Sequence, residues 1–339
     1  MSVVNDKIQV IKLSSPKKWS NALLLHRSFK ASQRSGKNHH AGMPMALSIE
    51  PTTACNLGCP ECPSGLKQFT RDTGNLKLEL NKKIIDELAP WLMHINYYFQ
   101  GEPFINPSFL QMVEYAGSKK IYTAASTNAH FITKEIALQT VRSGLKRLII
   151  SIDGTTQETY EQYRVNGSLD KVMEGTKNII AAKKELRSKS PHIIFQFLVV
   201  KPNEHQVNDV LELAKQLGVD EVRFKTAQVY DFKNGNPLIP ENEKFSRYKK
   251  QANGTWKLKN KMENHCWRMW SSCVITWDGL VVPCCFDKDA KHRLGDLKKQ
   301  SFVDIWQSKT YNDFRQKILT SRSQIDICQN CSEGTKVWA

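Results

Sequence analysis

Short β-rich runs alternate with amphipathic helical patterns from about residue 46, and this alternation constrains the fold more than any other feature. Several runs are almost continuously apolar, as expected for parallel strands that are buried on both faces. The predicted strands cover residues 46–52, 95–101, 121–127, 147–153, 193–200 and 221–229. Because no G-x-G-x-x-G follows the first strand, these six βα units predict an α/β protein with a barrel-like sheet rather than a dinucleotide-binding one.

The segments between the runs have helical periodicity and recognisable helix ends. Residues 206–218 form one such pattern, which closes at Gly218 as a predicted C-cap. A capping box that begins at Thr155 predicts the start of another helix, and a second one at Ser301 predicts a helix over residues 301–319. These patterns place a helix after most of the predicted strands, as a barrel of this kind requires.

Charge is spread unevenly along the chain. The 339 residues carry 49 Lys and Arg against 33 Asp and Glu, a net charge of +16. Residues 244–261 contain seven basic side chains and no acidic one. We interpret this run as a solvated linker; an anionic substrate, an acidic electron donor or nucleic acid is the less favoured interpretation. The chain is therefore divided into a basic N-terminal extension, the barrel, a basic linker and a cysteine-rich tail, over residues 1–45, 46–235, 236–265 and 266–339.

Neither a membrane span nor an export signal is predicted. No apolar run approaches the ~18 to 20 residues that would cross a bilayer. The N-terminus, MSVVNDKIQVIKLSSPKK, lacks the apolar core of a secretory signal. A cytoplasmic location is therefore expected, and there nine cysteines favour metal ligation over a disulfide framework.

Three cysteines follow the first predicted strand at a C-x3-C-x2-C spacing. They are Cys55, Cys59 and Cys62, and no fourth cysteine or histidine stands nearby to complete a ligand set. Metals that are held by thiolates usually take four protein ligands. A metal site with an open position is a catalytic feature rather than a structural one, so this loop is the predicted active site.

This loop, in this place in a six-unit barrel, resembles the radical S-adenosylmethionine (SAM) enzymes. The resemblance implies a partial (β/α)6 TIM-like barrel in which Cys55, Cys59 and Cys62 bind three irons of a four-iron, four-sulfur (4Fe-4S) cluster. In that family the amino and carboxylate groups of SAM chelate the fourth iron. A zinc knuckle or a ferredoxin-type electron carrier is the alternative interpretation.

Further motifs at successive strand ends match the same family. Gln100-Gly101-Glu102-Pro103 stands where members carry G-G-E-P, with Gln100 in place of the first glycine. Arg164 matches an arginine that pairs with the SAM carboxylate in related members, a task that suits a guanidinium. The resemblance implies that SAM is bound by Gln100, Gly101, Glu102, Pro103, Ser126, Asn128, Ser151, Asp153, Arg164 and Leu198.

The C-terminal cysteines resemble the SPASM extension of radical SAM enzymes. A first cysteine, a G-x4-C element from Gly279 to Cys284 and a later C-x2-C carry this resemblance. It implies one auxiliary 4Fe-4S cluster with every iron held by the protein; Cys273 and Cys285 remain alternates, because successive residues of an extended segment point in opposite directions. The implied ligands are Cys266, Cys284, Cys328 and Cys331. A four-cysteine zinc site is the alternative.

The resemblance also implies a reaction. Reductive cleavage of SAM would give a 5′-deoxyadenosyl radical that abstracts a substrate hydrogen, with electrons from a low-potential flavodoxin or ferredoxin. An auxiliary cluster that accepts an electron would make the net reaction a two-electron oxidation, so the enzyme is predicted to be an oxidoreductase. Asp287 is the candidate general base, although a lone aspartate in a turn is more often structural.

Two substrate classes remain open at this point. Peptide-modifying members often carry an N-terminal leader-binding domain, and residues 1–45 are too few to build one. A small alcohol or a carbohydrate-like molecule is therefore the favoured substrate, and a ribosomal peptide or protein is the alternative. A zinc-containing nucleic-acid-binding protein is the alternative from another class. We expect neither a membrane nor a nucleic-acid partner.

Overall fold

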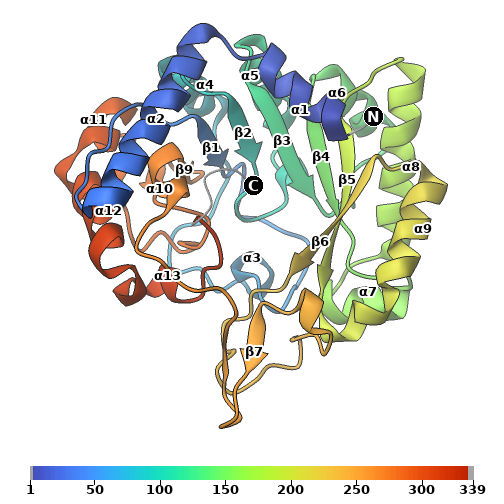
Figure 1. The fold of residues 1–339 in the computed structure, drawn as a ribbon. Coiled ribbons are helices and arrows are strands. Elements are labelled where there is room, and N and C mark those ends of the chain that lie inside the picture. Colours follow the sequence, from blue (N-terminus) through green and yellow to red (C-terminus); the bar gives the residue numbers. More distant parts are fainter. Residues whose placement is uncertain (1–2, 335–339) are drawn as a thin grey trace.

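A nine-stranded sheet with the strand order β11-β10-β9-β1-β2-β3-β4-β5-β6 organises the protein (Figure 1). The computed structural model describes residues 3–334; residues 1–2 and 335–339, at the ends of the first and last predicted regions, lie outside the described residues. Strands β1 to β6 are parallel, and each starts within one residue of a predicted strand. They are β1 (Ala46–Ile49), β2 (His94–Tyr97), β3 (Tyr122–Thr127), β4 (Arg147–Ser151), β5 (His192–Val199) and β6 (Glu221–Thr226). These six strands and their helices form the predicted partial barrel.

Helices follow the strands and cover the outer face of the sheet. They are α4 (Leu78–Leu88), α5 (Phe109–Ser118), α6 (Lys134–Arg142), α7 (Gln157–Tyr163), α8 (Leu169–Glu185) and α9 (Val207–Leu217), with short 3-10 segments η1 (Pro103–Ile105) and η2 (Lys201–Gln206). Their apolar faces meet the sheet in one core, where Ile85 and Leu88 of α4 and Ile95 of β2 are fully buried. Gly218 ends α9 in a left-handed conformation (φ 79°), as predicted.

The capping box predicted at Thr155 is displaced by one residue. The N-cap of α7 is Thr156, whose hydroxyl accepts a hydrogen bond from the backbone N–H of Thr159 at 3.3 Å. The N–H of Thr155 donates instead to Gln206 Oε1 at 2.8 Å. A residue that is distant in sequence therefore sets where this helix begins.

The N-terminal region forms helices α1 (Val3–Lys12) and α2 (Pro16–Ser35). Asp6 on α1 is buried, and its carboxylate pairs with Arg147 of β4 and accepts a hydrogen bond from the hydroxyl of Tyr122 on β3. Phe29 on α2 packs edge-on against Trp270, with ring centroids 5.5 Å apart. The predicted extension therefore packs against both the barrel and the C-terminal tail.

The cysteine-rich tail continues the barrel sheet. Strand β9 (Ser272–Ile275) pairs in parallel with β1, and β10 (Leu280–Val282) and β11 (Gly295–Asp296) follow in antiparallel order. The helix predicted over residues 301–319 is wrong in one respect, because the chain breaks at Ser308 and this residue caps a new helix. The helices of the tail are α10 (Trp267–Ser271), α11 (Phe302–Gln307), α12 (Lys309–Ser321) and α13 (Asp326–Gln329), with η4 (Arg322–Gln324).

The predicted basic linker contains ordered structure. After η3 (Glu243–Phe245), strands β7 (Tyr248–Lys250) and β8 (Trp256–Leu258) form an antiparallel hairpin that projects from the body of the molecule (Figure 1). We call residues 248–258 the basic hairpin. Every helix in the described part of the chain is too short or too polar to cross a membrane.

Candidate active site

The predicted cysteine loop borders a cavity at the carboxyl ends of the barrel strands. Cys55, Cys59 and Cys62 are free thiols that line this cavity, which has a volume of ≈ 270 Å³. Cys62 is the N-cap of a one-turn helix, α3 (Pro63–Leu66). Residues in or after β2, β3, β4, β5 and β6 form the other walls, and we call the space the cysteine-loop cavity.

Nitrogen donors approach two of the three sulfur atoms. Asn128 Nδ2 lies 4.0 Å from Cys55 Sγ, and Arg164 Nη1 lies 3.7 Å from Cys59 Sγ. Burial raises the pKa of the Cys59 thiol, and the positive charge of Arg164 opposes this shift. Such donors favour the thiolate form, which is the form that binds metal. In the described chain, no three His, Cys, Asp or Glu side chains are placed to hold a single metal ion.

Asp153 fixes the position of Arg164. Arg164 Nε donates to Asp153 Oδ2 at 2.5 Å, and the other carboxylate oxygen accepts the backbone N–H of Leu198 at 2.6 Å. Asn203 Nδ2 donates to the backbone carbonyl of Asp153 at 2.9 Å. Burial raises the pKa of the fully buried Asp153, and the guanidinium of Arg164 opposes this shift. The pair therefore joins the ends of β4 and β5 to the cysteine loop.

Gly101 allows two loops to approach closely. Its φ is 73°, and a Cβ there would overlap the carbonyl oxygen of Thr52 and lie 2.8 Å from that of Ala54. The N–H of Gly101 donates to Ser64 Oγ at 2.9 Å, and the next N–H, of Glu102, donates to the Ala54 carbonyl at 2.8 Å. Only glycine fits this position without strain.

Glu102 organises the end of β3 from beneath the cavity. Its carboxylate accepts hydrogen bonds from Thr127 Oγ1 at 2.8 Å and from the backbone N–H of Asn128 at 2.7 Å. Burial raises the pKa of Glu102 to about 7. The side chain is therefore occupied in holding Asn128, which itself lines the cavity.

The structure brings most of the predicted SAM-binding residues to this cavity. Those that line it are Gly101, Glu102, Ser126, Asn128, Ser151, Arg164 and Leu198. Gln100, Pro103 and Asp153 do not line it. Gln100 Nε2 donates to the Phe99 carbonyl, although its Oε1 lies 3.9 Å from Cys62 Sγ; Pro103 begins η1, and Asp153 lies behind Arg164.

Several lining residues were not among the site residues predicted from the sequence. Tyr98, Gln196 and Lys225 also border the cavity. Gln196 carries a signal that could have been used, because it is the polar residue in the otherwise apolar run 193–200. Tyr98 and Lys225 carry no such signal, since polar and aromatic residues are common at strand ends.

A second group of cysteines converges in the C-terminal tail. Cys266, Cys284, Cys328 and Cys331 line one small cavity, and the buried Arg322 lies beside it with Nη2 3.5 Å from Cys331 Sγ. The two alternates lie elsewhere. Cys273 is on β9, buried in the main core and in register with Leu47. Cys285 packs beside a separate apolar cluster of Val274, Val282 and Ala290.

Asp287, the candidate base, is held within its own turn. Its carboxylate oxygens accept the backbone N–H groups of Lys291 at 2.8 Å and His292 at 2.9 Å. Burial raises its pKa. The structure therefore shows the structural role, and a role as base remains a prediction.

Family models match two parts of the chain. The family model described as "Radical SAM superfamily" matches residues 49–214, the part of the chain that carries the cysteine loop. The chain belongs to the radical SAM superfamily. A second model, described as an iron-sulfur cluster-binding domain (SPASM), matches residues 266–332 of this radical SAM protein. The cofactors of such a protein are a 4Fe-4S cluster, SAM and auxiliary iron–sulfur clusters.

Several known proteins are similar to this radical SAM chain. The tungsten-containing aldehyde ferredoxin oxidoreductase cofactor-modifying protein of Pyrococcus furiosus is 28% identical over 320 residues, which cover 84% of this chain and 86% of that protein. The mycofactocin maturase MftC of Mycobacterium tuberculosis is 31% identical over 175 residues, 52% of this chain and 43% of the maturase. The structure of Streptococcus suis SuiB bound to precursor peptide SuiA has the same fold, with a TM-score of 0.62 at 14% identity, over 90% of this chain and 73% of SuiB.

Proposed function

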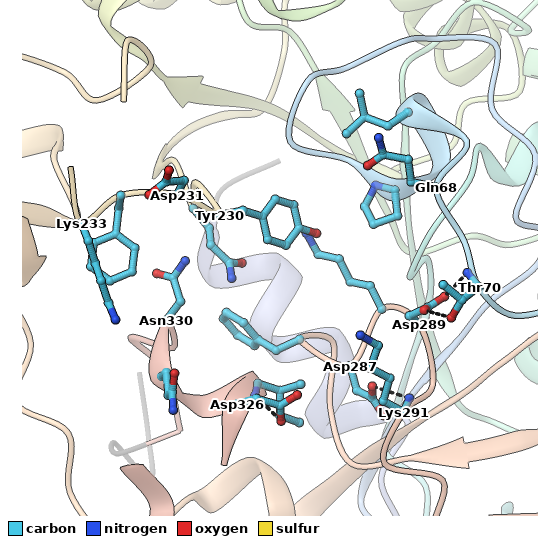
Figure 2. A pocket seen from close by; sticks show the side chains of 18 of the residues that line it. Gln68, Thr70, Tyr230, Asp231, Lys233, Asp287, Asp289, Lys291, Asp326 and Asn330 are labelled. Atoms are coloured by element: carbon cyan, nitrogen blue, oxygen red, sulfur yellow. Dashed lines mark hydrogen bonds between the residues drawn. The ribbon is translucent and has the colours of Figure 1, made fainter. Parts of the chain in front are cut away.

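We propose that this radical SAM enzyme oxidises a peptide substrate. The observation that carries the proposal is a second cavity, of ≈ 1130 Å³, between the cysteine loop, the segment after β6 and the C-terminal tail (Figure 2). Pockets that enclose small molecules usually measure about 300–1,000 Å³. We call this space the large cavity, and its size suits several residues of an extended chain.

The walls of the large cavity offer groups that recognise a peptide backbone. The side-chain amides of Gln68 and Gln228 line it and make no hydrogen bond within the described part of the chain. An amide can both donate and accept, so these two can pair with the C=O and N–H groups of a bound peptide. Asp231 and Lys233 also line the cavity, on the side away from Gln68 (Figure 2), so the lining carries both signs of charge.

The two cavities share one wall. Cys62, Ser64 and Gly65 line the cysteine-loop cavity, whereas Pro63 and Leu66 of the same turn line the large cavity. A peptide in the large cavity would therefore lie beside the loop that carries the cysteines. The proposal thus places the substrate next to the site that would generate the radical.

The residues that would hold the cofactors follow from the same geometry. Cys55, Cys59 and Cys62 would bind the cluster, and the lining residues Gly101, Ser126, Asn128, Ser151, Arg164 and Leu198 would hold SAM. When bound, the cluster and SAM supply the radical that abstracts hydrogen. The protein fixes Arg164 through Asp153, so its role is to orient the cofactor.

The four cysteines of the tail would hold one auxiliary cluster. Cys266, Cys284, Cys328 and Cys331 share a cavity, and the guanidinium of Arg322 beside Cys331 suits a negatively charged thiolate cluster. Such a cluster could take up one electron per oxidised substrate, and on this basis we propose that the enzyme is an oxidoreductase.

Similar proteins support the peptide over the small alcohol that the sequence favoured. SuiB is described with a precursor peptide, and neither sequence relative is named for the oxidation of an alcohol. The Pyrococcus relative covers this chain almost fully and is named for modifying a cofactor, so a cofactor precursor is the second candidate.

Reconstituted enzyme with SAM and dithionite tests the proposal. Under anaerobic conditions, a mixed peptide library should increase the formation of 5′-deoxyadenosine and yield a peptide that has lost two hydrogens, detected by mass spectrometry. The Gln228→Ala variant should lose this stimulation but keep the basal formation of 5′-deoxyadenosine without substrate. Stimulation by a mixture of alcohols and sugars, and none by peptides, would overturn the proposal.

A further inference from the structure

The basic hairpin holds two like charges directly opposite each other. Lys249 of β7 is in register with Lys257 of β8, and both side chains are exposed. Among the residues that the structure describes, neither ammonium group has a carboxylate within 4.0 Å. Like charges that face each other across an antiparallel pair destabilise it. An anionic partner would relieve this repulsion.

The surroundings add to the positive charge. Lys250 and Lys261, which are close to the pair in the sequence, are exposed as well. The two nearest acidic side chains on the preceding segment are already paired: Glu241 lies 2.7 Å from Lys201, and Glu243 lies 3.8 Å from Lys259. The outer face of the hairpin is therefore a basic surface with little internal compensation.

The inner face of the hairpin touches the auxiliary cysteine segment. Tyr248 is buried; its hydroxyl accepts the N–H of Val229 at 3.0 Å and donates to Asn330 Oδ1 at 2.9 Å. Asn330 stands between Cys328 and Cys331 in the sequence. The base of the hairpin is thus hydrogen-bonded to the C-x2-C segment.

The same inner face packs toward the first cysteine loop. Tyr248 belongs to one buried cluster with Leu57 and Cys59, and Trp256 and Leu258 of β8 pack against that cluster. Packed side chains therefore connect the exposed lysines to both cysteine segments. This is the placement expected of a surface that exchanges electrons with two metal centres.

We propose that the basic hairpin docks the acidic surface of a small redox protein, which supplies this enzyme with electrons. In each encounter the partner, a reduced flavin or iron–sulfur protein, is oxidised by one electron and this chain is reduced by one. The proposal depends on the clusters of the family and not on the peptide substrate. RNA is a poorer occupant, because Tyr248 and Trp256 face the interior and are not free to stack on bases.

Binding of flavodoxin and ferredoxin to the reconstituted holoenzyme tests this docking site. The variant is Lys249→Glu/Lys257→Glu, and the matched control is Lys177→Glu/Lys184→Glu, which makes the same charge change at exposed positions of α8. We expect the hairpin variant to bind at least one of the two acidic probes about tenfold or more weakly at low salt, and the control to bind like the wild type. Wild-type binding should also weaken as salt rises, since ions screen exposed charges.

The rate of SAM cleavage gives a second measurement on the same proteins. The hairpin variant should match the wild type with dithionite and fall about tenfold with reduced flavodoxin or ferredoxin. Three results would overturn the docking site. The variant and the wild type could bind both probes equally, or the wild type could bind neither probe in a salt-sensitive way. The third result is that the variant loses binding only for an oligouridine or a polyglutamate peptide. If dithionite supports no cleavage of SAM, the proposed enzyme activity is contradicted instead. The binding measurements with flavodoxin and ferredoxin would still decide the docking site.

Discussion

Arg164 and Asp153 form an ion pair in which Nε and Oδ2 are 2.5 Å apart, and the carboxylate is fully buried behind the cysteine-loop cavity. The Asp153→Asn substitution keeps the shape of the side chain but removes the charge that holds the guanidinium. We expect SAM affinity to fall by about tenfold or more, because a charge-assisted hydrogen bond holds the Arg164 guanidinium in place far better than a neutral one. Equilibrium binding of SAM to the reconstituted variant measures this. Glu158→Gln, an exposed carboxylate on α7, is the control and should leave SAM affinity unchanged.

Gly101→Ala should prevent assembly of the site. The added methyl group would overlap the Thr52 carbonyl in a left-handed backbone conformation. We expect little iron in the cysteine-loop site and no SAM cleavage, measured by iron analysis and by 5′-deoxyadenosine. Gly117→Ala on α5 is the matched control, since a Cβ there meets nothing within 4 Å, and the variant should behave like the wild type. Normal cleavage in Gly101→Ala would show that the close approach of the two loops is not needed.

A buried ion pair ties the loop after the cysteines to the end of β1. Arg71 donates to both carboxylate oxygens of Glu50, at 2.6 and 2.8 Å, and Arg71 Nε donates to the backbone carbonyl of Lys288 in the tail. Arg71→Met would leave the Glu50 carboxylate buried without its partner, which typically costs about 3–5 kcal/mol. Thermal unfolding should show a clear drop in the midpoint, whereas Lys309→Met, which removes an exposed pair with Asp313, should show almost none.

Adjacent cysteines should behave differently when the auxiliary site is tested. Cys284 lines the small cavity with the C-x2-C cysteines, whereas Cys285 packs elsewhere and Cys273 lies in the core. Cys284→Ala should lower the iron content from roughly eight to roughly four per chain, because one of two four-iron clusters is lost. Cys285→Ala and Cys273→Ala should retain roughly eight. Loss of iron in Cys285→Ala with full iron in Cys284→Ala would reverse the assignment.

The sequence predicted the barrel well because several of the strands are largely apolar runs with their own local signal. The start of β4 at Arg147 is an example. Features that depend on distant residues escaped prediction. The pairing of β9 with β1 places Cys273 opposite Leu47, and no local sequence pattern predicts this pairing. The shift of the α7 cap to Thr156 depends on Gln206, and it too has no local signal.

The site was predictable to the extent that its residues follow strands directly. The three cysteines and Arg164 were found from spacing and family resemblance, and the structure brings them to one cavity. The side-chain contacts of Glu102 and Asp153 were not, because their partners come from neighbouring strands. The basic hairpin lies in the run that the sequence predicts only as a linker, since its strands are three residues long and rich in lysine.

The most direct test of the central claim is electron paramagnetic resonance of the reduced Cys328→Ala/Cys331→Ala variant during titration with SAM. This variant lacks the auxiliary ligands, so the remaining signal should come from the cluster of Cys55, Cys59 and Cys62. The account predicts that SAM changes this signal, because one iron is left for SAM to bind. A cluster signal that stays the same at saturating SAM would contradict it.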